Sequence, residues 1–434
     1  MGRLGLRGPA CVLALAVITA VVLSPLQAPA QQAPTPVTSN FSVRIGGYVQ
    51  TNVTWDSDEN QDDNPSALRE LAVRRDTSFQ RRETLRWAAT RTRLFVDIRG
   101  PETLGAKTRA YTEFDWDGLK LNDDGESSAT AAHTPRLRHA YARLDWPRTY
   151  LTVGQTTLIF DSVVSSQSEL EGVSSSHGDI TSGSRNRAPQ FILGYVMPIG
   201  EAKLEVAGSV GRHATDQNPT PPEDNAQGLN DSGARSALPA LQGLIKGSLP
   251  LFGRDAILAV SGYWGEATLV QDSAGGSRAF RKVNSTGLAL EGVLPLPAFA
   301  GITPELRGAT FTADNMAAWN LGHNGLTSTS PTGNPREITA YGGWVEGNLD
   351  LPMKFAVGAG YGHVGDDREW VIKRGGSQRP VTNDAGWLFG QWSAGPILTE
   401  LLYGKIATVR IDTSTRREHA TQSDAVHLVF RYRF

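Results

Sequence analysis

Cysteine is almost absent from this chain. The 434 residues contain one, Cys11, and it lies within an apolar run at positions 10–23. Two arginines precede that run, and the small-residue triplet Ala28-Pro29-Ala30 follows it. This order is typical of a secretory signal peptide, so we expect residues 1–30 to be removed during export. The expected mature chain then has no cysteine, which excludes disulfide and thiol chemistry.

Long apolar runs and an excess of positive charge are also missing. After residue 30 no apolar stretch reaches the roughly 18 residues that indicate a transmembrane helix. The chain has 42 Lys and Arg against 44 Asp and Glu, which excludes a basic binder of nucleic acid. Glycine is abundant, with 46 residues, and 10 Trp and 10 Tyr are present. This composition is typical of β-structure with many turns.

Hydrophobicity alternates with a period of two along several segments. Residues 41–55, 91–99 and 107–116 each place apolar or small side chains on one face and mainly polar or charged ones on the other. In residues 107–116 one face ends in Phe114 and Trp116, whereas the opposite face carries Lys107, Arg109 and Glu113. Such strands fit an outer-membrane β-barrel, in which one face meets lipid and the other lines a wet lumen.

Long and short connections alternate along the chain, and each short connection contains a proline. The long ones are predicted near 56–90, 117–135, 157–187, 212–237, 267–282, 313–337, 364–384 and 410–422. Eight long loops and seven short turns join sixteen strands. We therefore predict an all-β transmembrane antiparallel barrel over 41–434, with long extracellular loops and short periplasmic turns. Residues 31–40 are expected to be a short periplasmic segment.

The last nine residues, 426–434, alternate again and end on Phe434. Closing strands of bacterial outer-membrane proteins commonly end on an aromatic residue, which implies handling by the barrel insertion machinery. The expected location is the outer membrane of a Gram-negative-type bacterium, in contact with lipid and lipopolysaccharide.

Four segments, in this order, resemble the DcaP-like outer-membrane porins: 45–49 (IGGYV), 111–115 (YTEFD), 137–141 (LRHAY) and 151–156 (LTVGQT). The match covers roughly residues 41–160 by motif and the rest by architecture, and phosphate-selective porins are neighbours of this family. The resemblance implies a trimeric barrel of sixteen strands that passes small anionic solutes. Some members carry a coiled coil before the barrel, which this sequence lacks, so a trimer would be held by small-residue wall faces: Ala140 and Ala142; Gly343 and Gly347.

The strand phase predicts which charges line the lumen. The predicted pore-lining residues are Arg44, Arg91, Arg93, Arg99, Lys107, Arg109, Glu113, Arg143, Arg431 and Arg433. Cations outnumber the four inward acids of the same strands, and a basic wall attracts carboxylates and phosphates. The alternative is that arginines and acids simply neutralise one another across strands.

The third long loop, 157–187, is the candidate constriction, because in many porins the loop at this place folds into the barrel. Its charged residues are Asp161, Glu169, Glu171, Asp179, Arg185 and Arg187. Acids there, opposite a basic wall, would create a transverse field. The alternative is a solvated surface loop with no role in permeation.

No catalytic, cofactor or metal site is predicted, because His139 and His427 lack any catalytic or metal-binding motif around them and are expected to be polar lumen residues. Trp116, Trp146, Trp344 and Trp392 are expected in the aromatic girdles at the membrane interfaces. The function predicted is passive diffusion of small hydrophilic solutes, with anionic ones favoured. The alternatives are a barrel enzyme, or an adhesion or structural barrel without an open pore.

Overall fold

The computed structural model describes residues 41–57, 83–116, 134–161, 187–213, 236–272, 278–317, 323–326, 335–375 and 379–434. The expected signal peptide and the segment 31–40 lie outside these ranges. None of the described helices is both long and apolar enough to cross a membrane.

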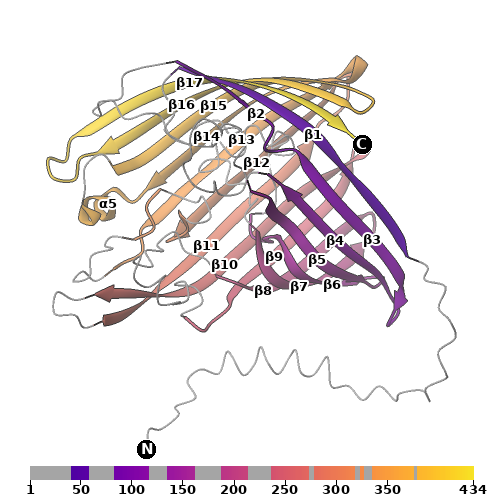
Figure 1. The fold of residues 1–434 in the computed structure, drawn as a ribbon, viewed down its shortest axis with the longest axis horizontal. Coiled ribbons are helices and arrows are strands. Elements are labelled where there is room, and N and C mark those ends of the chain that lie inside the picture. Colours follow the sequence, from indigo (N-terminus) through magenta and orange to yellow (C-terminus); the bar gives the residue numbers. More distant parts are fainter. Residues whose placement is uncertain are drawn as a thin grey trace, which may run out of the picture. The chain divides into compact units, whose positions relative to one another are not determined.

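Seventeen strand segments make up one antiparallel sheet (Figure 1). They are β1 (Ser42–Asp56), β2 (Thr84–Ala88), β3 (Arg93–Thr103), β4 (Ala106–Asp115), β5 (Arg136–Asp145), β6 (Thr149–Thr157), β7 (Arg187–Ile199), β8 (Ala202–Gly211), β9 (Ala240–Leu251), β10 (Arg254–Asp272), β11 (Arg278–Pro295), β12 (Thr303–Asp314), β13 (Thr339–Leu351), β14 (Phe355–Asp366), β15 (Arg379–Ala394), β16 (Ile397–Ile411) and β17 (Glu418–Arg433).

The sheet closes on itself as a barrel of sixteen strands, which confirms the predicted fold. Strands β2 and β3 both pair with β1, β2 along its second half and β3 along its first, so together they form one interrupted strand. The barrel closes where β1 pairs with β17. The paired residues run from Tyr48 opposite Arg433 to Asp56 opposite Ala425. Figure 1 shows these first and last strands side by side.

The expected alternation of faces is present in the strands. In β17 the side chains of His427, Val429 and Arg431 are buried, whereas the intervening Leu428 and Phe430 are exposed. The burial pattern therefore separates an inward face from an outward face, and the large apolar side chains of the outward face are suited to lipid.

Three sequence expectations need correction. Trp344 lies on the inward face of β13, 5% exposed and clustered with Trp387 and Phe389, so it is not part of an outer girdle. The long loop expected at 267–282 is mostly strand, because β10 and β11 pair as far as Asp272–Arg278. The connection expected at 410–422 is a turn of residues 412–417 between β16 and β17. A short helix, α5 (Arg368–Arg374), follows β14.

Gly154 gives a test of this packing. Its φ is +129°, and a Cβ there would lie 2.2 Å from the carbonyl oxygen of Ala140 on β5. We expect Gly154→Ala to lower the free energy of unfolding by more than the roughly 1–2 kcal/mol of left-handed backbone strain, because the strand would also have to move. Denaturant unfolding of the refolded protein measures this. Gly390→Ala is the matched control, since nothing lies within 4 Å of the added Cβ, and equal losses in both variants would contradict the prediction.

Candidate functional site

The candidate site is the inner wall formed by β1, β3, β4, β5, β6 and β17. Cross-strand pairing brings its cations together: Arg99 on β3 lies opposite Arg109 on β4, which in turn lies opposite Arg143 on β5. Three guanidinium groups thus occupy one row across three neighbouring strands. Such a row arises because each residue has inward phase in its own strand.

Carboxylates of the same wall hold several of these cations. Arg109 Nε donates to Asp97 Oδ1 at 2.7 Å, and Arg143 Nε donates to Asp145 Oδ1 at 2.8 Å. Arg93 Nη1 lies 3.1 Å from Glu113 Oε1. The mutual neutralisation that the sequence left open is therefore realised for part of the wall.

A β-bulge adds two arginines that sequence reasoning missed. The register between β4 and β5 shifts beside Glu113, where Arg138 has no Cα partner of its own. Both Arg136 and Arg138 consequently reach inward, and both contact the fully buried Asp115 at 2.7 Å. Arg138 Nε also donates to Glu113 at 2.8 Å. Strict alternation counted from Arg143 places Arg136 and Arg138 on the lipid face. Arginine is unsuited to lipid, and this conflict was the only signal of the bulge in the sequence.

Aromatic rings lie between the guanidinium groups. Phe95, Tyr111 and Tyr141 follow one another with ring centroids 5.7 and 5.6 Å apart. Arg109 lies 5.0 Å from the Tyr111 ring, and Arg143 lies 4.1 Å from the ring of Tyr150. These cation–π contacts hold the flexible arginines against the wall.

Of the nine predicted pore-lining cations, four have no carboxylate partner among the described residues: Arg44, Arg99, Lys107 and Arg433. All four are exposed. They lie at strand ends on the periplasmic side, where the short turns are; Arg99 and Lys107 flank the β3–β4 turn. This end of the wall therefore carries an accessible positive charge that its neighbouring acids leave uncompensated.

The two remaining predicted cations have other surroundings. Arg431 donates to Gln50 Oε1 at 2.9 and 2.6 Å and lies 4.0 Å from the Tyr48 ring. Arg91 is buried in the break between β2 and β3, outside any strand. Arg91 was predicted to face the lumen from strand alternation, and that reasoning does not apply to a residue outside a strand.

Apolar side chains also gather on the inner face. Trp344, Trp387 and Leu402 form one buried cluster on β13, β15 and β16. A carboxylate sits among them, because Trp387 Nε1 donates to Glu346 Oε2 at 2.9 Å. Glu291 and Glu400 are buried on β11 and β16 as well. Buried carboxylates are therefore present outside the basic wall as well as within it.

The start of the third long loop turns into the barrel. The backbone N–H groups of Ile159 and Phe160 donate to Gln242 Oε1 on β9, at 3.0 and 3.1 Å. Asp161 N donates to Ser261 Oγ on β10 at 2.9 Å, and a Cβ on Gly287 of β11 would lie 2.7 Å from the Phe160 ring.

Of the predicted loop residues, Asp161 is buried and Arg187 donates from Nε to His139 Nε2 at 3.4 Å. Glu169, Glu171, Asp179 and Arg185 lie outside the described residues. Within the described ranges no three His, Cys, Asp or Glu side chains gather as a metal-binding group.

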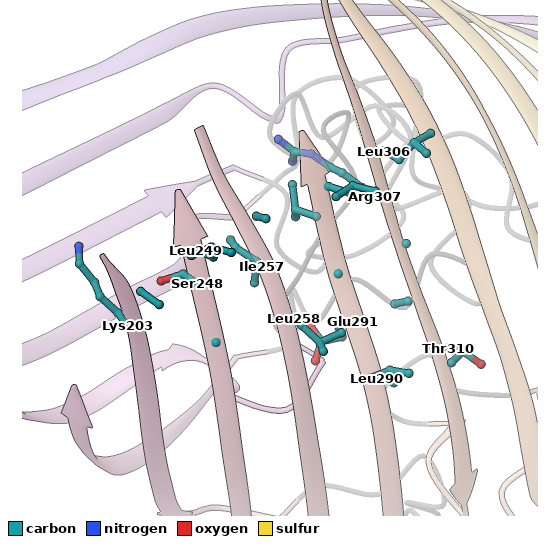
Figure 2. A pocket seen from close by; sticks show the side chains of 18 of the residues that line it. Lys203, Ser248, Leu249, Ile257, Leu258, Leu290, Glu291, Leu306, Arg307 and Thr310 are labelled. Carbon is teal, nitrogen blue, oxygen red and sulfur yellow. The ribbon is translucent and has the colours of Figure 1, made fainter. Parts of the chain in front are cut away.

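A second kind of feature lies on the outer face. A hollow of about 880 Å³ spans β8 to β13, with glycines at its floor and leucines around it (Figure 2). Gly292 pairs with Gly308 on the next strand, and the neighbouring Leu258, Leu290 and Leu306 are exposed. Smaller hollows continue over Gly343 and Gly347. This face is apolar and indented, unlike the charged inner wall.

No protein-family model matches the chain, and no curated protein sequence matches it. Solved structures do. The outer membrane channel DcaP of Acinetobacter baumannii is 15% identical with a TM-score of 0.61, covering 91% of this chain and 97% of that one. OprB of Pseudomonas putida is 11% identical with a TM-score of 0.54, covering 90% and 94%. An anion-selective porin from Comamonas acidovorans is 10% identical with a TM-score of 0.52, covering 91% and 100%.

The fold is that of an outer-membrane β-barrel of sixteen strands. Within that class the architecture fits a DcaP-like porin, as the four sequence segments indicated. At these identities the likeness concerns the fold alone.

Asp115 tests the bulged cluster. Asp115→Asn removes a fully buried carboxylate that two arginines contact, so we expect a loss of about 3 kcal/mol in the free energy of unfolding. Asp145→Asn is the control; it breaks a half-exposed pair with Arg143 and should cost about 1 kcal/mol or less. Chemical denaturation of the two refolded variants gives the comparison. Equal costs would mean that Arg136 and Arg138 do not depend on Asp115.

Proposed function

We propose that this protein is an outer-membrane porin through which small hydrophilic, mainly anionic solutes diffuse passively. The observation that carries the proposal is the exposed, unpaired group of Arg44, Arg99, Lys107 and Arg433 at the periplasmic end of the lumen wall. Exposed charges attract an ion of opposite sign through water and are screened by salt. Carboxylate and phosphate solutes would gain from these groups without having to break an ion pair.

The paired arginines would serve differently. Their carboxylate partners cancel most of the charge, but a guanidinium has five N–H donors and keeps some free for a passing oxygen. A narrow ring of this kind sets both the size and the charge preference of a pore.

An enzyme, or an adhesion or structural barrel, is less favoured. Two of the solved structures with this fold are named as an outer membrane channel and as an anion-selective porin. The Comamonas protein is named as anion-selective, and we extend this property to the present chain on the charge distribution.

Selectivity is the direct test. Replacing Arg44, Arg99 and Lys107 together with Gln should lower the anion-to-cation permeability ratio about twofold at 0.1 M salt, since three screened charges contribute on the order of 0.4 kcal/mol. The reversal potential of the refolded protein in a planar bilayer under a salt gradient measures this. Arg148→Gln with Lys354→Gln removes charge from periplasmic turns and should have little effect. An unchanged permeability ratio in the triple variant would show that these three residues do not set the anion preference.

We also propose that the loop 157–187 narrows the pore. The inward anchoring of Leu158–Asp161 on β9, β10 and β11 supports this, because it directs the chain away from the rim. Deleting residues 162–186 should raise the single-channel conductance. Deleting residues 214–235, a connection of similar length, should leave the conductance unchanged. If the two deletion variants have the same single-channel conductance, the third loop lies outside the pore.

The protein is further proposed to assemble as a homotrimer and to enter the membrane through the insertion machinery that reads Phe434. In a ring of three barrels each barrel touches its neighbours at points about 60° apart, close to three strands of sixteen. Ala142 on β5 and Gly347 on β13 are eight strands apart, on opposite sides. A closed trimer can therefore use only one of the two small-residue faces, and the hollows favour the face around Gly347.

Tryptophan scanning distinguishes the faces. Gly347→Trp should convert a trimer into folded monomers, whereas Ala142→Trp should leave the assembly intact. Light scattering of the detergent-solubilised protein gives the mass of each. If Ala142→Trp alone dissociates the assembly, the contact face is on β5.

A further inference from the structure

A polar pocket lies on the outer face of the barrel, at the extracellular end of β11, β12 and β13. Its volume is about 400 Å³. The residues that line it are Asn284 and Thr286 of β11, Asp314 of β12, Arg336 and Glu337 just before β13, and Trp370 of α5. Polar side chains are unexpected where the outer face of a barrel meets hydrocarbon, so the position of the pocket along the strands decides what can fill it.

Strand alternation places the pocket on the outer face. Thr286 lies on the same face of β11 as Leu288 and Leu290, which are 55% and 46% exposed. Asp314 is the last residue of β12, and the preceding Ala313 has the opposite phase and is buried. The short turns join the other ends of these strands, so the pocket is at the extracellular rim.

Other strands show the same change from apolar to polar toward their extracellular ends. On β15, Leu388 is 58% exposed on the outer face, whereas Asp384, on the same face and nearer the extracellular end, accepts a hydrogen bond from Tyr361. Tyr403 on β16 likewise donates to Asp424 on β17. Ionised side chains are costly on the lipid face near the middle of the bilayer and cost little at its interfaces. The outward ends of these strands therefore reach the level of the lipid headgroups.

The pocket contains hydrogen-bond acceptors that no cation neutralises. Asp314 accepts from the hydroxyls of Thr286 and Thr339 at 2.9 and 2.6 Å, and Glu337 accepts from the backbone N–H of Asn284 at 2.8 Å. Neither carboxylate forms an ion pair with a described residue. The side-chain amide of Asn284 is exposed and makes no hydrogen bond within the described ranges. Both carboxylates keep lone pairs for a further donor, and the amide can donate as well as accept.

Two cations lie over the ring of Trp370. Lys373 Nζ is 3.7 Å and Arg336 Cζ is 5.5 Å from the centroid of the indole. Lys373 is exposed and has no carboxylate partner among the described residues. Trp370 packs against the buried cluster that contains Ile338 and Val371, so the ring is fixed in place. Donors and acceptors therefore occur together around this pocket.

We propose that this pocket binds a core sugar of a lipopolysaccharide molecule that lies against the barrel. Sugar hydroxyls both donate and accept, so they can donate to Asp314 and Glu337 and accept from Asn284 and Lys373. A bare phosphate would meet two carboxylates, and an acyl chain would leave the polar groups without partners. The pocket faces away from the lumen, so a glycan anchored in the outer leaflet reaches it and a solute inside the pore does not. The proposal rests on the outer-membrane location of the barrel and is independent of solute passage.

Two probes test the site by surface plasmon resonance on the refolded protein in detergent. One is lipopolysaccharide with a complete core oligosaccharide, and the other is lipid A, which has the acyl chains and phosphates but no core. We expect the complete molecule to bind about fivefold more tightly or better, since at least one additional hydrogen bond forms. Equal affinities would mean that the protein recognises the lipid or the phosphates, which overturns the proposal.

Asn284→Ala and Asp314→Asn remove groups from the pocket. Each should weaken binding of the complete lipopolysaccharide about fivefold, the effect of one lost hydrogen bond, and leave lipid A binding unchanged. The Asn284 variant should fold normally, because this side chain has no bond within the described ranges. Asp384→Asn is the matched control, since Asp384 is another outward-facing acid that accepts from a hydroxyl but lies outside the pocket. If Asp384→Asn weakens binding as much as Asp314→Asn does, the rim as a whole attracts lipopolysaccharide and the assignment to the pocket is wrong.

Two further readouts separate the alternatives. The preference for the complete core should persist in EDTA; its loss there would mean that a divalent ion bridges the carboxylates to a phosphate, which overturns the proposal. The single-channel conductance of Asn284→Ala should equal that of the unaltered protein, because the pocket is outside the lumen. Failure of sugar binding is therefore distinguishable from failure of the proposed porin function.

Discussion

The rest of this structure depends on the absence of a free sheet edge. In lipid no water can satisfy an unpaired backbone N–H or C=O group, so a spanning sheet must close. Closure rests on the pairing of β1 with β17, and it reaches the last residue, because Phe434 N donates to the carbonyl of Gly47 and Gly47 N to that of Phe434. Every inward side chain then faces a confined lumen, which forces the polar groups there to find partners among themselves.

That confinement explains the division of the inner wall. Arginines placed beside acids are neutralised, as Arg109 is by Asp97 and Arg138 by Glu113 and Asp115. Cations at the strand ends, beyond the reach of the acids, stay exposed and keep their charge. On the proposed function, the electrostatic character of the pore therefore comes from a few residues at the periplasmic end rather than from the total count of arginines.

Sequence periodicity was reliable where strands are regular and failed where they are not. It assigned Arg93, Arg109 and Arg143 to the inward face, and in the structure they form ion pairs with Glu113, Asp97 and Asp145 respectively. It missed Arg136 and Arg138, because one extra residue in a strand reverses the faces on either side of it. It also assigned Trp344 to the outer girdle from residue type alone, although register places it against Trp387.

The sequence by itself determined the barrel. Alternation of apolar and polar residues, the rhythm of long and short connections and the aromatic C-terminus are local properties, and each is readable without knowing any distant contact. Only the tertiary structure decided which charges cancel, where the third loop turns inward and which polar side chains meet at the outer rim. Those outcomes depend on register between strands that are far apart in the chain, as with Arg431 and Gln50 at a separation of 381 residues. Register is set by closure of the whole sheet.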